Sequence, residues 1–108
     1  MKCLDTFRKE PYKHDCAMAV AYKYADILGL SKEEAVKKFS GLAASRAPGA
    51  VCGALYVATC LLPNKADQIT KTFQERVGAI TCLDIKTKAR TSCPDCVDIT
   101  DQIIEKLK

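Results

Sequence analysis

The sequence predicts an all-α fold, arranged as a single-domain bundle of about five helices. Two observations support the helices directly: apolar residues recur at helical spacing in several segments, and capping residues precede some of these segments. A third argues against a sheet, because the one segment with alternating apolar residues, 80–85, has no partner strand elsewhere in the chain. The length of 108 residues suits one domain over residues 1–108.

The first expected helix is central and buried. Apolar residues are dense from 16 to 28, on most sides of a helix, and Pro11 upstream is compatible with a first helical turn. Gly29 is a natural C-terminal stop. The preceding residues, 1–10, are expected to form a mobile tail.

The second expected helix is short. Ser31 and Glu34 have the spacing of a capping box. In this motif the serine side chain accepts a hydrogen bond from the glutamate backbone N–H, and the glutamate side chain accepts one from the serine backbone N–H. The helix is expected to end near Gly41. Small residues and a Pro-Gly pair then predict a loop over 43–49.

Two further helices are expected in the middle of the chain. The stretch 50–62 is almost wholly apolar, which favours a buried helix that ends before Pro63. An amphipathic helix follows, with Asn64 as its start and Gly78 as its end. Its apolar stripe consists of Ala66, Ile69, Phe73 and Val77.

The last helix is expected to begin around Ser92–Asp95, after a loop or short helical turn over 80–90. Pro94 suits a first helical turn. The apolar stripe of this helix consists of Ile99, Ile103 and Leu107.

Seven cysteines are far more than a chain of this length usually carries. The N-terminus lacks the apolar run of a secretory signal, and no stretch approaches the roughly 20 apolar residues of a membrane span. We therefore expect a cytoplasmic protein without a membrane segment. In that compartment cysteine clusters are typically catalytic, redox-sensing or metal-binding, and an odd number of cysteines cannot all pair within one chain.

The most specific local signal is a Cys-x-x-Cys pair, Cys93 and Cys96. A cysteine at a helix N-terminus meets unpaired N–H groups and the positive end of the helix dipole, which favour the thiolate. Lys88 and Arg90 upstream have the same effect. Cys96 is in register with the apolar stripe and is expected to face the core. The alternative is a free thiol beside an ordinary helix cap.

The second signal is Cys52-Gly53-Ala54 on the expected buried helix. Glycine inside a helix costs about 1 kcal/mol relative to alanine, which is tolerated most easily where another group must approach closely. We therefore expect Cys52, Gly53 and Ala54 to form a cofactor-binding or reactive position. Cys60 on the same helix is expected to be only a small buried hydrophobic residue.

The remaining cysteines and the one histidine carry weaker signals. Cys16 lies in the first helix and Cys82 in the irregular segment, while Cys3 in the tail is expected to be incidental. His14 is expected to be a solvated surface residue and a poor partner for Cys16, because residues two apart face differently on a helix.

The order of these features resembles the C_GCAxxG_C_C family of redox-active proteins. The resemblance rests on four cysteines in order, from about residue 16 to residue 97, with the Cys-Gly-Ala motif at the second. The corresponding residues are Cys16, Cys52, Cys82 and either Cys93 or Cys96. Val57 stands where the motif has its later glycine. The resemblance implies a redox role.

Three functions follow from these patterns. The first is thiol–disulfide or electron-transfer chemistry of a thiol oxidoreductase-like protein, with Cys93 attacking and Cys96, Cys52 or Cys82 resolving. Its catalytic candidates are Cys16, Cys52, Cys82, Cys93 and Cys96. The second is a thiolate site for zinc or an iron–sulfur cluster. Its metal ligands would be Cys16, Cys52, Cys82 and Cys93. The third is a non-catalytic helical interaction domain with inert cysteines.

Other classes of function lack their signals. Basic residues are scattered and aromatic residues make up only 6% of the chain, so no nucleic-acid partner is expected. A thioredoxin fold would need a βαβ pattern, and Val97 after Cys96 excludes a c-type haem motif. No phosphate-binding loop or dinucleotide fingerprint is present. A protein redox partner is expected, and the sequence leaves the oligomeric state open.

Overall fold

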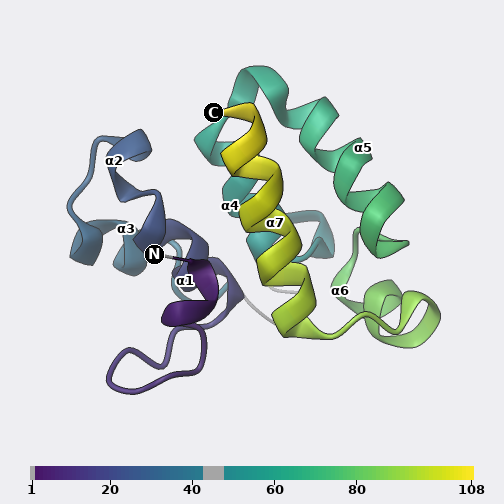
Figure 1. Ribbon diagram of the computed structural model, residues 1–108, viewed down its shortest axis with the longest axis horizontal. Helices are drawn as coiled ribbons and strands as arrows, with labels where there is room; N and C mark the ends of the chain where they lie inside the picture. The colour runs from purple at the N-terminus through teal and green to yellow at the C-terminus, as the bar shows by residue number, and fades with distance from the viewer. Residues whose placement is uncertain (1, 43–47) are drawn as a thin grey trace.

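The computed structural model describes residues 2–42 and 48–108, and over these residues it is mostly helical, without a β-strand (Figure 1). The all-α prediction is confirmed, but the predicted number of about five helices is too low, because the described part of the chain forms seven α-helices. They are α1 (Cys16–Lys23), α2 (Ala25–Leu28), α3 (Lys32–Lys38), α4 (Gly53–Leu61), α5 (Ala66–Val77), α6 (Cys82–Asp84) and α7 (Cys93–Leu107). Four shorter helical turns accompany them: η1 (Cys3–Asp5), η2 (Pro48–Ala50), η3 (Pro63–Lys65) and the π-helical η4 (Ile85–Ala89).

The predicted first helix starts later than expected and is divided. Asp15 caps α1 by accepting a hydrogen bond from the Met18 N–H at 2.8 Å, so the helix begins at Cys16 and Pro11 lies outside it. The backbone leaves helical geometry at Tyr24, which separates α1 from α2. Gly29 then ends α2 in the left-handed conformation, as predicted.

The predicted cap of α3 is confirmed, and α7 begins within its predicted range with Ser92 as the cap. The Ser31 hydroxyl accepts from the Glu34 N–H to start α3, and Ser92 accepts from the Asp95 N–H to start α7. The end of α5 at Gly78, at φ +103°, is also as predicted.

Two boundaries were predicted wrongly. Asn64 does not cap α5, because Pro63 instead starts the 3-10 turn η3 and α5 begins at Ala66. The helix α4 begins at Gly53 and not at residue 50, since residues 48–50 form the separate turn η2. Residues 43–47 of the predicted loop lie outside the described part of the chain.

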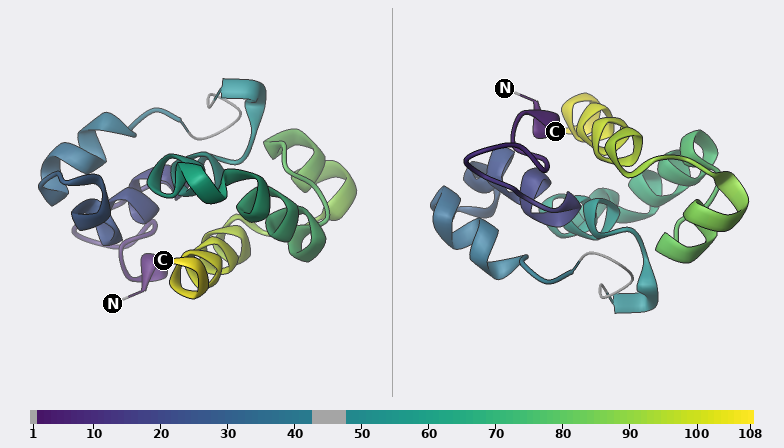
Figure 2. Two further views of the ribbon diagram at one scale, coloured as in Figure 1. Left: turned by 90° about the horizontal axis from the view of Figure 1, so that it is seen from above. Right: turned by 90° about the horizontal axis from the view of Figure 1, so that it is seen from below.

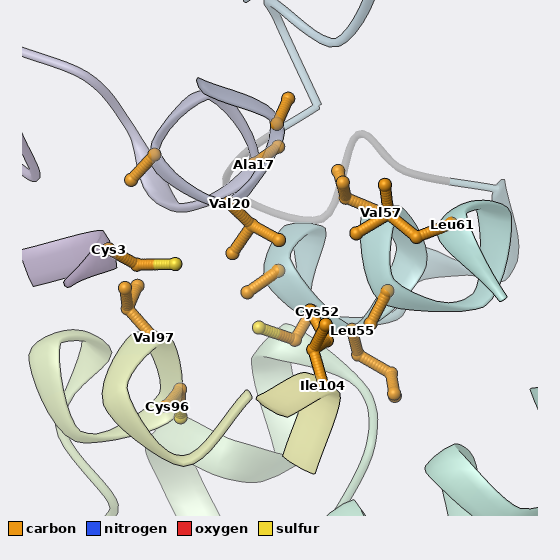
Figure 3. Packing of buried hydrophobic residues seen from close by; sticks show 14 of the residues in the cluster. Cys3, Ala17, Val20, Cys52, Leu55, Val57, Leu61, Cys96, Val97 and Ile104 are labelled. Carbon is orange, nitrogen blue, oxygen red and sulfur yellow. The ribbon is translucent and has the colours of Figure 1, made fainter. Parts of the chain in front are cut away.

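The core forms where α1, α4 and α7 meet. Helix α1 packs against α3, α4 and α7, and α4 packs against α5 and α7. In Figure 1, α5 and α7 lie side by side, and the views of Figure 2 show α1–α3 grouped on the other side of α7. Val20, Leu55 and Ile104 are fully buried between these helices (Figure 3), and each contributes about 1.5–3 kcal/mol by leaving water.

The N-terminal segment, residues 3–7, packs onto the bundle and does not form the predicted loose tail. Cys3 and Phe7 are buried, and the Cys3 N–H donates a hydrogen bond of 2.9 Å to Oδ2 of Asp101 on α7. Asp101 is itself buried and forms an ion pair with Lys23 of α1 at 2.5 Å. This carboxylate therefore ties the start of the chain to two core helices.

Within the part of the chain that the structure describes, no helix combines the length and apolar character that spanning a bilayer would need.

Candidate functional site

Four cysteines occupy the first residue or the N-cap of four different helices. Cys16 is the first residue of α1, Cys52 the N-cap of α4, Cys82 the first residue of α6 and Cys93 the first residue of α7. Only Cys93 was predicted at such a position. Cys16 lies in the first helix as predicted, but as its first residue because Asp15 caps α1; the prediction that Cys52 lies on the buried helix was wrong, because the turn η2 delays the start of α4 to Gly53.

These helix starts converge on one cavity of about 120 Å³. Its walls contain five cysteines: Cys16, Cys52, Cys82, Cys93 and Cys96. They come from four helices that are far apart in the sequence, so the topology of the bundle and not a local motif brings the sulfurs together. The N-termini of α1, α4 and α7 carry partial positive charge, which favours negative charge in this cavity.

Gly53 allows the closest approach at the site. A Cβ atom at this position would lie 2.9 Å from the Sγ atom of Cys16, 3.1 Å from the Leu42 carbonyl oxygen and 3.3 Å from the Ala17 Cβ atom. The prediction of a close approach at this glycine is confirmed. Without a side chain, the start of α4 packs directly against α1 and leaves room for the Cys16 thiol.

Three thiols are coupled as a chain in which Cys52 is the middle member. Its Sγ atom contacts those of Cys16 and Cys96; Figure 3 shows Cys52 and Cys96 on facing elements. The hydrogen bond from Cys52 lowers the pKa of the Cys96 thiol, although burial and the neighbouring Cys93 oppose this. Cys96 is thus the member of the chain that most readily becomes a thiolate.

The other two members of the chain hold their protons. The bond to Cys16 lowers the pKa of Cys52, but the bond to Cys96 and burial outweigh it and raise that pKa to about 11. The bond to Cys52, together with burial, raises the pKa of Cys16 far above the usual thiol range. Of these three thiols, Cys96 is therefore the one whose environment favours the thiolate, while Cys16 and Cys52 favour the protonated form.

Access to the sulfurs differs among the five cysteines. Cys52 and Cys96 are buried, with 7% and 2% of their surface exposed, whereas Cys16, Cys82 and Cys93 are partly exposed. The prediction that Cys96 faces the core is confirmed. Because Cys93 and Cys96 lie on the first turn of the same helix, the pair joins a reachable thiol to a buried one.

Two cationic side chains, Arg8 and Lys86, line the same cavity. Neither belongs to any of the ion pairs found in residues 2–42 and 48–108. The acidic residue at the cavity, Asp15, uses its carboxylate to cap α1. The two charged side chains at the cavity wall that form no ion pair are thus both positive. Phe7 and Ile85 supply apolar surface beside it.

Three predicted placements away from the cavity were wrong. Cys60 is exposed and contacts Tyr56, where a buried position was expected. His14 is 6% exposed and packs between Tyr12 and Tyr22, where a solvated position was expected, and burial lowers its pKa. Cys3 is buried near Asp101 and not in a mobile tail; burial raises its pKa.

The cavity residues missed by sequence reasoning include Phe7, Arg8, Ile85 and Lys86. No local signal marked Phe7 or Arg8, because their position depends on the packing of residues 3–7 against α7. Lys86 reaches the cavity because η4 follows α6 without a break.

The cavity cysteines are not preorganised as the ligands of a metal ion. In residues 2–42 and 48–108, no three side chains of the Cys, His, Asp or Glu type are grouped closely enough to hold a metal ion. All seven cysteines are free thiols. The catalytic roles of the five cavity cysteines, the cofactor role of Cys52, Gly53 and Ala54, and the four-cysteine metal site stay predictions.

Comparison with known proteins gives one match. Residues 14–108 match the family described as "Putative redox-active protein (C_GCAxxG_C_C)". No curated protein and no solved structure shows significant similarity to the chain. The matched region contains all five cavity cysteines and excludes Phe7 and Arg8.

Proposed function

The chain belongs to the C_GCAxxG_C_C family of putative redox-active proteins, and on this premise we propose that it is a cytoplasmic thiol–disulfide redox protein. Cys93 is the attacking thiol and Cys96 the resolving one. The observation that carries the proposal is that the accessible Cys93 and the buried Cys96 lie on one turn of α7 and line the same cavity as Cys16, Cys52 and Cys82; the lowered pKa of Cys96 supports it.

The reaction proceeds in two exchanges. The Cys93 thiolate attacks a substrate disulfide R–S–S–R′, forming the mixed disulfide Cys93–S–S–R and releasing R′–S⁻. The Cys96 thiolate then attacks the Cys93 sulfur, forming the Cys93–Cys96 disulfide and releasing R–S⁻. The substrate gains two electrons and the cysteine pair loses them. Cys52 supports the second step because its interaction with Cys96 lowers the pKa of the Cys96 thiol and so favours the thiolate.

The test uses the reduced protein and hydroxyethyl disulfide, a small neutral oxidant. Differential alkylation followed by peptide mass spectrometry should find the Cys93–Cys96 disulfide in the wild type and a mixed disulfide on Cys93 in Cys96→Ser. Cys93→Ser should react much more slowly, and Cys60→Ser, at an exposed thiol away from the cavity, should behave as wild type. Equal rates for Cys93→Ser and the wild type would reject the proposal.

A second candidate function is a thiolate centre for zinc or an iron–sulfur cluster, held by Cys16, Cys52, Cys82 and Cys93. The convergence of these four residues on one cavity favours it, since four sulfur ligands suit a tetrahedral metal or a cluster. The four sulfur atoms would have to move closer together for each to lie about 2.3 Å from one zinc ion. Anaerobic purification with metal and sulfide analysis tests this candidate: a protein without stoichiometric metal would exclude it.

A further inference from the structure

The cavity has a definite size, charge and chemical lining, and these limit what it can accept. A cavity of roughly 150 Å³ holds benzene, which has six non-hydrogen atoms, so about 120 Å³ admits a ligand of about five. A peptide segment or a bulky cofactor is too large to enter. The ligand of the cavity itself is therefore a small molecule.

The charge of the cavity selects an anion. Arg8 and Lys86 line it without an ion pair to satisfy them, while Asp15 is engaged by the N-terminus of α1. The N-termini of α4 and α7 add partial positive charge at the same cavity, whereas that of α1 is offset by the Asp15 carboxylate. This is a second contribution of the same sign, supplied by the backbone.

The five thiols determine which atom of the anion reacts. Sulfur nucleophiles attack sulfur that is already bonded to a leaving group, as in thiol–disulfide exchange. We propose that the substrate of this site is a small inorganic anion with a sulfur–sulfur bond, of the size and charge of thiosulfate, bound by Arg8 and Lys86 against the cavity thiols. This inference rests on the proposed thiol redox function and names its substrate class.

The steps balance with the cysteine pair as the only reductant. The Cys93 thiolate attacks the outer sulfur of S–SO₃²⁻, the sulfur–sulfur bond breaks, and SO₃²⁻ leaves a Cys93–S–S⁻ persulfide behind. The Cys96 thiolate then attacks the Cys93 sulfur, the persulfide bond breaks, and the outer sulfur takes a proton from water and leaves as HS⁻. The thiosulfate ion gains two electrons overall, and Cys93 and Cys96 lose two in forming their disulfide.

A single-turnover experiment tests the inference. Reduced wild-type protein mixed with thiosulfate should release one sulfite and one sulfide per Cys93–Cys96 disulfide formed. Arg8→Gln and Lys86→Gln should each raise the half-saturating thiosulfate concentration about tenfold, as expected for losing one charge-assisted contact. Arg8→Lys keeps the charge and should retain most of the binding. Lys71→Gln, at an exposed position on α5, is the matched control and should change the half-saturating thiosulfate concentration less than twofold.

The outcomes separate this inference from the function on which it rests. If thiosulfate yields no sulfite while hydroxyethyl disulfide still oxidises Cys93 and Cys96, the substrate class is wrong and the redox function stands. If neither compound oxidises the pair, the proposed function itself fails. If sulfite forms equally well in both Gln variants, which circular dichroism must show to be folded, recognition by Arg8 and Lys86 is wrong.

Discussion

Gly53 lies so close to Cys16 that a Cβ atom at position 53 would be 2.9 Å from the Cys16 Sγ atom. The neighbours on the other sides are the Leu42 carbonyl oxygen and the Ala17 Cβ atom, so the start of α4 has little freedom to move away. The glycine of the Cys-Gly-Ala motif is therefore a packing requirement for the thiol chain.

Gly53→Ala should destabilise the protein by about 1–3 kcal/mol, the usual cost of adding a methyl group to a packed core. The gain in helix propensity from alanine, at most about 1 kcal/mol, offsets only part of it. Urea denaturation measures the change, with Cys60→Ala on the exposed side of α4 as the control. A Gly53→Ala protein as stable as the wild type would contradict the predicted crowding.

Cys52→Ala should raise the pKa of Cys96, because the hydrogen bond from Cys52 is the main cause of its lowering. Cys52→Ser keeps a donor and should preserve more of the effect. The pH dependence of Cys96 alkylation, followed by peptide mass spectrometry, reports the shift. Identical pH profiles for wild type and Cys52→Ala would show that the bond does not tune Cys96.

Cys93 should be alkylated faster than Cys60 near neutral pH, since Cys93 lies at the positive end of the α7 dipole. The comparison is stringent because Cys60 is the more exposed of the two. Timed labelling with iodoacetamide ranks all seven thiols in one experiment. If Cys60 reacts first, exposure and not activation governs reactivity in this protein.

Asp101→Asn should cost about 3 kcal/mol of stability at neutral pH, the lower end for breaking a buried ion pair. Burial opposes ionisation of Asp101, but the hydrogen bonds from Lys23, Tyr24 and the Cys3 N–H prevail and lower its pKa below the usual 3.8. Because the pKa of Asp101 is lower in the folded state than in the unfolded state, its ionised carboxylate stabilises the protein at pH values above the unfolded-state pKa. This stabilisation is lost as the pH falls through the folded-state pKa.

The difference in the free energy of unfolding between wild type and Asp101→Asn should therefore be largest at neutral pH and shrink below about pH 4. Urea denaturation at a series of pH values measures it. Asp67→Asn, at an exposed position of α5, should show no comparable effect at any pH. A constant difference between wild type and Asp101→Asn would mean that the ion pair is not its cause.

The sequence predicts the local features of this fold better than the long-range ones. Caps at Ser31 and Ser92 and the glycine at residue 53 were predictable because each depends on residues within a few positions. The start of α1 was placed too early, because the apolar pattern before Cys16 did not reveal the cap at Asp15.

The candidate site was predictable in its cysteines and not in its charges. The five cysteines stood out by residue type and by the resemblance to a family. The position of Arg8 depends on the hydrogen bond between Cys3 and Asp101, which are 98 residues apart, and no local pattern encodes such a contact.

The residues before position 14 have a consequence for specificity. The family match begins at residue 14, yet Phe7 and Arg8 form part of the cavity wall. Part of the surface that selects the substrate is thus encoded outside the stretch that carries the sulfur chemistry. A protein with the same cysteines but a different N-terminal segment would keep the reaction and act on different substrates. Substrate preference can therefore diverge here without a change in the reactive cysteines.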